Sequence, residues 1–202
     1  MLIEHMKTLS TPLDHSSAIE NTCIETLLKS TFEYTNTPPF RSPHHSISYA
    51  GMLGGKNPPQ PGEITRANHG ILFLDELGEY HRSILDTLRE PMESQAIQLS
   101  RAGHSISYPA NFLLVAAMNP CYCGYYFDLR HPCQCTPIKI KHYWQKISQP
   151  LLDRISICSI LSKPSKYQSS ISHTELKELV ATGKKIATQR NPNGCSNQFL
   201  RE

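Results

Sequence analysis

Two adjacent carboxylates, Asp75 and Glu76, follow a short apolar run at residues 71–74 (Ile-Leu-Phe-Leu). A parallel strand that is buried on both faces reads as such a continuous apolar run, and ligands of open α/β sheets bind beyond the carboxyl ends of these strands. Asp75 is then placed to hold Mg²⁺, directly or through water, and Glu76 to orient and deprotonate an attacking water. The simpler interpretation is a core strand that ends in a solvated Asp-Glu pair, because short motifs also arise by chance.

Four of the seven cysteines form two close pairs, Cys121-x-Cys123 and Cys133-x-Cys135, with nine residues between the pairs. Such a quartet of thiolates can close a tetrahedral zinc site, in which His131 can also replace one thiolate. The alternative is a set of reduced, unliganded thiols, because ligands one residue apart have limited reach around a single ion. The other three cysteines are expected to be small buried or surface residues: Cys23, Cys158 and Cys195.

The segments around these residues predict the elements that position them. Residues 81–94 place apolar side chains on one helical face and predict a helix after the acidic pair. Two short alternating runs, 96–100 and 105–108, predict a β-hairpin. A second buried strand over 112–118 ends at Asn119. An acidic strand, a helix, a hairpin and a polar-tipped strand in this order indicate one phosphate-facing edge.

Six collinear stretches carry a resemblance to a known family: 40–45, 61–64, 70–77, 88–93, 116–121 and 150–155. From about residue 40 to about residue 161 the chain resembles the magnesium-chelatase-like AAA+ ATPases of the YifB/ComM type. The Cys-rich insert after Asn119 makes it less similar to the magnesium-chelatase ATPase subunit itself. The resemblance implies an ATP-driven ring, usually hexameric, and in ComM-like members a helicase that drives DNA branch migration during natural transformation.

The same resemblance implies roles for four residues. Asp75 and Glu76 match the Walker B pair, and Asn119 matches the sensor that contacts the γ-phosphate of ATP or the lytic water. Arg154 matches the arginine finger that is given to the neighbouring subunit's nucleotide, where a planar, permanently charged guanidinium stabilises the transferring phosphoryl group. For Arg154 the alternative is a surface salt bridge with Asp153 or another carboxylate.

The predicted hairpin tip carries Arg101 and His104. In related ring motors such hairpins project into the central pore, where basic tips can follow a nucleic-acid backbone; the alternative is a solvated turn. His44 and His45 are expected to be structural, because adjacent side chains of an extended chain point to opposite sides. Four other basic residues can face a ring pore or solvent: Arg130, Lys139, Lys141 and Lys146.

Residues 1–202 contain no G-x-x-x-x-G-K-[S/T] phosphate loop. The nearest stretch, residues 50–57, has Ala50 in place of the first Gly and Asn57 in place of Ser or Thr, and two prolines follow it instead of a helix. The family's phosphate loop is expected upstream of about Leu13, so the start is expected to be a truncation or a wrongly assigned first Met.

The predicted fold is α/β: an incomplete AAA+ P-loop NTPase core with a parallel sheet, flanking helices, a β-hairpin insertion and a Cys-rich loop. Residues 1–161 are assigned to this core, with an insertion at 40–70, the Cys-rich loop at 119–137 and a helix over 16–34. Residues 162–202 are assigned to the start of a truncated helical lid, whose helix opens at a capping box, Ser172 to Glu175.

Composition adds few constraints. The chain has 202 residues, is 39% hydrophobic and has a net charge of +3, which is too mild to argue for nucleic-acid binding. No apolar run approaches the ~18 residues of a membrane helix, and the N-terminus has no signal-peptide pattern, so a cytoplasmic chain without a membrane partner is expected. A core that lacks its first strand is expected to expose a sheet edge and to be marginally stable.

Two classes of function follow. The chain is either part of an ATPase subunit, which uses ATP and Mg²⁺ with a phosphate loop from another segment, or a non-catalytic remnant or interaction module stabilised by Zn²⁺. The expected partners in the first case are other ring subunits and single-stranded or branched DNA, although a porphyrin-chelating partner or another protein stays open. By itself, the chain is expected to hydrolyse negligible ATP.

Overall fold

The computed structural model describes residues 2–29, 31–55, 57–101, 104–128, 130–161 and 171–190, except for the side chains of residues 2–4, 101 and 104. The chain divides into two compact units, Pro12–Ile157 and Met1–Thr11 with Cys158–Glu202. Cys195 and much of the predicted lid, 162–170 and 191–202, lie outside the described residues.

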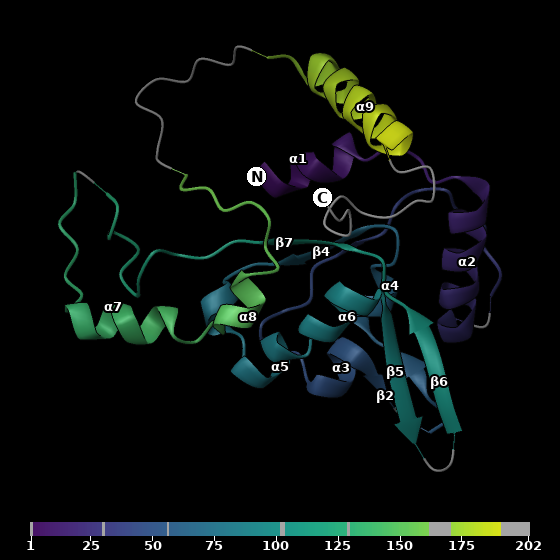
Figure 1. Ribbon diagram of the computed structural model, residues 1–202, viewed down its shortest axis with the longest axis horizontal. Coiled ribbons are helices and arrows are strands. Elements are labelled where there is room, and N and C mark those ends of the chain that lie inside the picture. Colours follow the sequence, from purple (N-terminus) through teal and green to yellow (C-terminus); the bar gives the residue numbers. More distant parts are fainter. Residues whose placement is uncertain are drawn as a thin grey trace. The chain divides into compact units, whose positions relative to one another are not determined.

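A parallel sheet of three strands organises the larger unit, in the order β1 (Phe40–Arg41), β4 (Ile71–Leu74) and β7 (Leu113–Ala116). All four residues of β4 are buried, as the apolar run predicts for a central strand. Helices lie between successive parallel strands and cover the sheet (Figure 1). The parallel sheet with flanking helices confirms the predicted α/β class.

Short helices and two hairpins complete this unit. Figure 1 shows α3, α5 and α6 grouped together near the sheet, and β5 and β6 as a long hairpin. The hairpin agrees with the predicted runs, and its register pairs Ala96 with Pro109 and Arg101 with His104. The elements are α2 (His15–Lys29), α3 (Tyr49–Leu53), β2 (Gly54–Gly55), β3 (Gln60–Pro61), α4 (Glu63–Arg66), η1 (Leu77–Glu79), α5 (Arg82–Asp86), α6 (Arg89–Ser94), β5 (Ala96–Arg101), β6 (His104–Pro109), α7 (Pro137–Trp144) and α8 (Gln149–Leu152).

The segment 81–94 is helical, as predicted, but it forms two short helices, α5 and α6, instead of one. The amide of Leu88 bonds three residues back, to Leu85 O at 3.2 Å, instead of continuing an α-helical ladder. Pro91 has no N–H and its ring would clash with a helical carbonyl four residues earlier. A fresh helix that begins at Arg89 places Pro91 in the first turn, where proline is tolerated.

The Gly-rich stretch at 50–57 does not form a phosphate cradle among its described residues. Ala50 lies in α3, and Gly54 and Gly55 form β2, which pairs with β3. Gly54 has a φ of 114°, and a Cβ there would meet Gln60 O at 2.5 Å. The glycine is therefore required by this tight hairpin.

The hydrophobic core lies between β4 and the short helices. Leu72 and Leu74 point into it and are fully buried. The buried residues that share this cluster are Met52, Leu53, Ile64, Ala67, Leu77, Tyr80, Ile84, Leu85, Leu88, Ile97, Ala110, Ile147 and Leu151. The core therefore fixes the strand that carries the acidic pair.

The smaller unit contains α1 (Leu2–Leu9) and α9 (His173–Arg190). The Ser172 amide donates to Glu175 Oε2 at 2.6 Å, and the Glu175 amide donates to Ser172 Oγ at 3.2 Å. These reciprocal bonds are the predicted capping box, and they lower the pKa of the Glu175 carboxyl. No described helix combines the length and the apolar character that a membrane span needs.

Leu72→Ala should destabilise the chain by about 2–5 kcal/mol, because it removes a fully buried side chain and leaves a cavity beside the short helices. Urea unfolding followed by circular dichroism measures this. Leu113→Ala on the neighbouring strand is the matched control, since Leu113 is 56% exposed. Equal losses of stability in both variants would contradict this account of the core.

Candidate functional site

The carboxyl ends of β4 and β7 bring the predicted site residues to one edge of the sheet. Leu74 pairs with Ala116, and the ladder continues past both strands, because the Ala117 amide donates to Leu74 O at 2.9 Å and the Leu77 amide to Ala117 O at 2.9 Å. Asp75 and Glu76 lie within this continuation, and Asn119 follows it after two residues. All three side chains are exposed. Their roles toward a nucleotide stay predictions.

The backbone turns sharply at Glu76, which has left-handed angles of φ 51° and ψ 48°. Such angles are unfavourable for a residue other than glycine and often mark functional sites. The Glu76 amide donates to Asp75 Oδ1 at 2.9 Å, which steadies the turn. Asp75 Oδ1 thereby accepts one hydrogen bond, and both carboxylate oxygens keep lone pairs that can bind a cation.

His45 is a residue of this site that sequence reasoning missed. Its Nε2 lies 3.9 Å from Glu76 Oε2, and its ring centroid is 4.1 Å from that of His44. The expectation that the two rings point to opposite sides was wrong, because the chain turns here and the Ile47 amide bonds to His44 O at 2.9 Å. The Pro-His-His sequence before this turn was the available signal.

Tyr80 anchors the same region from the other side of the turn. Its hydroxyl donates to Pro43 O at 2.6 Å, and its ring meets His45 edge-on at a centroid distance of 6.4 Å. Burial, and secondarily the negative charge of Asp75, raise the pKa of Tyr80 from the usual 10.0 to about 12. Tyr80 therefore ties the segment after β1 to the turn after Glu76.

Arg154 is engaged within its own chain. Its guanidinium donates to the Glu93 carboxylate on α6 and to the Pro150 carbonyl. Asp153, the other carboxylate considered from the sequence, instead accepts a bond from Gln149 Nε2 at 2.8 Å. The salt-bridge alternative is therefore present with Glu93 as the partner, while the finger role toward a neighbouring subunit stays a prediction.

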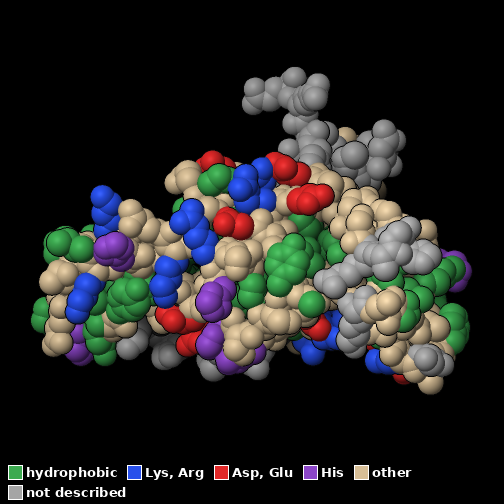
Figure 2. Space-filling view, turned by 90° about the horizontal axis from the view of Figure 1, so that it is seen from below, with side chains coloured by type: hydrophobic (Ala, Val, Ile, Leu, Met, Phe, Trp, Pro, Cys, Tyr) green, Lys and Arg blue, Asp and Glu red, His purple; other side chains and the backbone are tan. Residues whose placement is uncertain are grey.

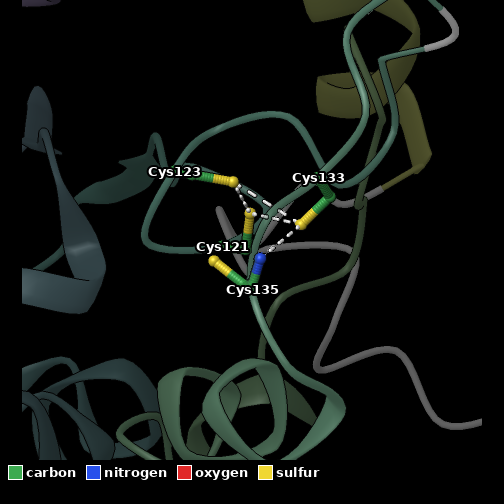
Figure 3. A group of neighbouring side chains, drawn as sticks. All are labelled: Cys121, Cys123, Cys133 and Cys135. Atoms are coloured by element: carbon green, nitrogen blue, oxygen red, sulfur yellow. Dashed lines mark hydrogen bonds between the residues drawn. The ribbon is translucent and has the colours of Figure 1, made fainter.

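The four clustered cysteines converge, as Figure 3 shows. Their sulfurs all lie within 4.8 Å of one another, and three of the separations are 3.3 Å (Cys121–Cys123), 3.6 Å (Cys121–Cys133) and 3.5 Å (Cys123–Cys133). Four sulfurs at about 2.3 Å from a tetrahedral zinc ion would lie roughly 3.8 Å apart. The cluster can therefore hold a metal ion.

The thiols of the cluster have different pKa values. Backbone amides of Tyr125 and Gln134 lower the pKa of Cys123 to about 6. The pKa of Cys133 is raised to about 12, because burial and the neighbouring thiols outweigh the bond from the Cys135 amide. The thiols of the cluster therefore differ in how easily they lose a proton. His131 does not belong to the cluster, since its Nδ1 lies 3.3 Å from Asp128 Oδ2.

The basic residues divide into two groups. Arg130, Lys139 and Lys141 are exposed. Lys146 is partly buried and donates to Gly78 O at 2.7 Å, two residues after Glu76, and its expected place at a ring pore stays a prediction. At the hairpin tip the backbone pairs Arg101 with His104, but both side chains and residues 102–103 lie outside the described part.

Tyr80→Phe should reduce the loss in the free energy of unfolding that the wild-type chain shows as the pH rises from about 9 to about 11.5. Because folding raises the pKa of Tyr80, its contribution is full below pH 10 and is lost as the pH rises toward about 12. Urea unfolding at about pH 9 and about pH 11.5 compares the variants. Tyr49→Phe, which removes an exposed tyrosine, should keep the wild-type loss. An unchanged loss in Tyr80→Phe would contradict the assignment.

Comparison with known proteins identifies the family. The family described as "Magnesium chelatase, subunit ChlI" matches residues 1–169. The chain is 42% identical to "Uncharacterized protein YifB" of Salmonella typhimurium over 187 residues, which cover 92% of this chain and 36% of that protein. It is 45% identical to YifB of Escherichia coli (78% and 31% covered) and 39% identical to "Competence protein ComM" of Haemophilus influenzae (86% and 34%).

The chain thus spans about a third of the length of these curated relatives. The resemblance seen in the sequence is confirmed, and the chain belongs to the magnesium chelatase family as a member of its YifB/ComM type.

Proposed function

We propose that this chain is the central part of an ATP-driven ring motor that remodels DNA. The observation that carries the proposal is the pairing of β4 with β7, which puts two carboxylates and an amide at the same edge of a parallel sheet. Ligands of open α/β sheets bind at such an edge. The membership in the magnesium chelatase family supports a nucleotide as that ligand.

Each residue has a distinct task in this proposal. Asp75 uses the oxygen that does not accept the Glu76 amide to hold Mg²⁺, which prefers oxygen ligands and neutralises phosphate charge when it is bound. Glu76 accepts a proton from the attacking water, with His45 3.9 Å from its carboxylate. Asn119 donates its amide hydrogens to the γ-phosphate or holds the water.

Nucleotide binding further requires a phosphate loop from outside residues 1–202, since no matching motif occurs within them. In the assembled ring, which we take to be hexameric, Arg154 would exchange Glu93 for the phosphate of a neighbouring subunit's nucleotide. A guanidinium can make this exchange because it binds carboxylate and phosphate with the same planar fork.

Charge and aromatic side chains support DNA as the substrate that the motor moves. Within residues 121–146 three basic side chains are exposed, Arg130, Lys139 and Lys141, and Asp128 is the single acidic residue of this segment. In Figure 2, blue Lys and Arg side chains lie among green hydrophobic ones at the left, where Figure 1 places α7. Tyr125, Tyr126 and Phe127 are exposed in this segment. Basic groups with exposed rings suit single strands, whose bases stack on aromatic side chains.

A second candidate is a non-catalytic interaction module that is stabilised by a metal ion. The convergence of the four cysteines favours it, because the cluster requires no nucleotide. The motor candidate requires ATP hydrolysis that depends on Glu76, whereas the interaction module requires no hydrolysis.

A chimera separates them: residues 40–161 replace the matching segment of Escherichia coli YifB. We expect Mg²⁺-dependent ATP hydrolysis by the chimera and a loss of at least about 100-fold in Glu76→Gln, because a general base contributes this much. A coupled assay of ADP release measures both. Glu90→Gln, an exposed carboxylate on α6, is the control and should keep the rate.

An inactive chimera beside an active parent, or full activity in Glu76→Gln, would contradict the motor proposal. The isolated chain should hydrolyse negligible ATP, and steady hydrolysis that Glu76→Gln abolishes would overturn the need for an outside phosphate loop.

The double variant Lys139→Ala/Lys141→Ala should bind a single-stranded oligonucleotide about 10-fold more weakly than the wild-type chain. Each lost phosphate contact should lower the slope of log affinity against log salt by about 0.7. Fluorescence anisotropy at several salt concentrations measures both quantities. The control replaces two exposed lysines of α9, Lys177 and Lys185, with alanine. Equal effects of the two double variants would refute a specific DNA surface on residues 121–146.

A further inference from the structure

We propose that Cys121, Cys123, Cys133 and Cys135 bind one zinc ion through four thiolates, and that this ion fastens the segment after Asn119 to the start of α7. The metal site stands independently of the motor. Only the roles of Asn119 as a sensor and of Glu76 as a general base rest on the proposed function.

The dimensions and chemistry of the cluster select a single thiophilic ion. The three sulfur separations of 3.3–3.6 Å exceed the ~2.05 Å of a disulfide bond and approach the roughly 3.8 Å of a tetrahedral zinc site. A maximum spread of 4.8 Å leaves space for one ion at the centre, and sulfur ligands favour zinc over Mg²⁺ or Ca²⁺. Binding releases the thiol protons to solvent, because zinc takes thiolates.

The ligands lie at both ends of the Cys-rich loop. Cys121 is two residues after Asn119 and is fully buried. Cys135 directly precedes Thr136, the N-cap of α7, whose hydroxyl accepts from the Lys139 amide. An ion that binds both cysteines therefore joins the end of the sensor strand to the first turn of a helix.

Helix α7 then contacts the segment that the ion holds. Trp144 Nε1 donates to Pro120 O at 3.1 Å, one residue before the first ligand. The Tyr143 ring packs edge-on against Tyr122, with ring centroids 4.7 Å apart. The ammonium of Lys146 lies 5.4 Å from the centre of the Tyr122 ring and 5.6 Å from that of Tyr143.

The same helix and the residues just after it reach the turn that follows Glu76. Lys146 donates to Gly78 O at 2.7 Å and lies 3.8 Å from Glu79 Oε1. Tyr143 packs so closely that a Cβ on Gly78 would come within 2.8 Å of its ring. Zinc, α7 and this turn thus form one connected brace between Asn119 and Glu76, so the ion orders the two segments that carry the sensor and the acidic pair.

Metal content tests the site directly. The chain is purified under reducing conditions, loaded with zinc, desalted and measured by mass spectrometry of the metal. We expect about one zinc per chain, and less than a tenth of that in Cys121→Ser and Cys135→Ser. Cys23→Ser, which removes an exposed cysteine outside the cluster, should keep one zinc. Absence of zinc from the wild-type chain, or equal zinc in all variants, would overturn the proposal.

Cobalt provides a readout that does not depend on the folding of a variant. Co²⁺ in place of zinc should give the intense near-ultraviolet thiolate-to-metal bands and the visible bands of a tetrahedral site. An octahedral, weakly absorbing spectrum would overturn the four-thiolate assignment even if the serine variants do not fold.

Fluorescence and hydrogen exchange test the connection from the zinc site through α7 to the turn after Glu76. Trp144 is the single tryptophan, so its emission should shift when a chelator removes zinc. Hydrogen exchange should quicken at 119–124 and at 77–80 but not in the β5–β6 hairpin. Quickening at 119–124 alone would refute the connection to Glu76. Neither measurement uses ATP, so a failure here is distinguishable from a failure of the motor proposal.

Discussion

The parallel hydrogen bonds between β4 and β7 are the interaction on which the rest of the structure depends. They run from Ile71 and Leu113 to Leu74 and Ala116 and continue through Ala117. Because the pairing is parallel, both strands deliver their following residues to the same edge. The short helices pack on the buried face of β4, and α7 braces the loops that leave the two strands. A change of register by one residue would shift the acidic pair relative to Asn119 and turn Leu72 and Leu74 away from the core.

Much of this arrangement could be predicted, because the signals are local. The apolar run at 71–74 leads to a buried strand, the alternation at 96–108 leads to a hairpin, and Ser172 with Glu175 leads to a capped helix. The spacing of the cysteine pairs left a metal site and separate thiols both open, and the structure shows that the four sulfurs converge. The break between α5 and α6 also has a local signal in Pro91, which lacks the N–H that a continuous helix would need.

The contacts that could not be predicted join residues that are distant in sequence. Arg154 and Glu93 are 61 positions apart, and Lys146 and the Gly78 carbonyl are 68 apart. The sequence indicates that Lys146 can donate hydrogen bonds. It does not indicate which acceptor the lysine binds, because every residue has a backbone carbonyl and the one of Gly78 is not marked by a side chain. The approach of His45 to Glu76 depends on a turn whose geometry overrides the alternation of an extended chain.

The backbone at Glu76 has left-handed angles that favour residues other than glutamate. Glycine or asparagine would adopt these angles with less strain, and neither would supply a carboxylate beyond the strand. Position 76 therefore carries a carboxylate at a cost in backbone strain. Selection for stability alone would therefore be expected to replace this glutamate with glycine or asparagine, and the turn would keep its shape without its carboxylate.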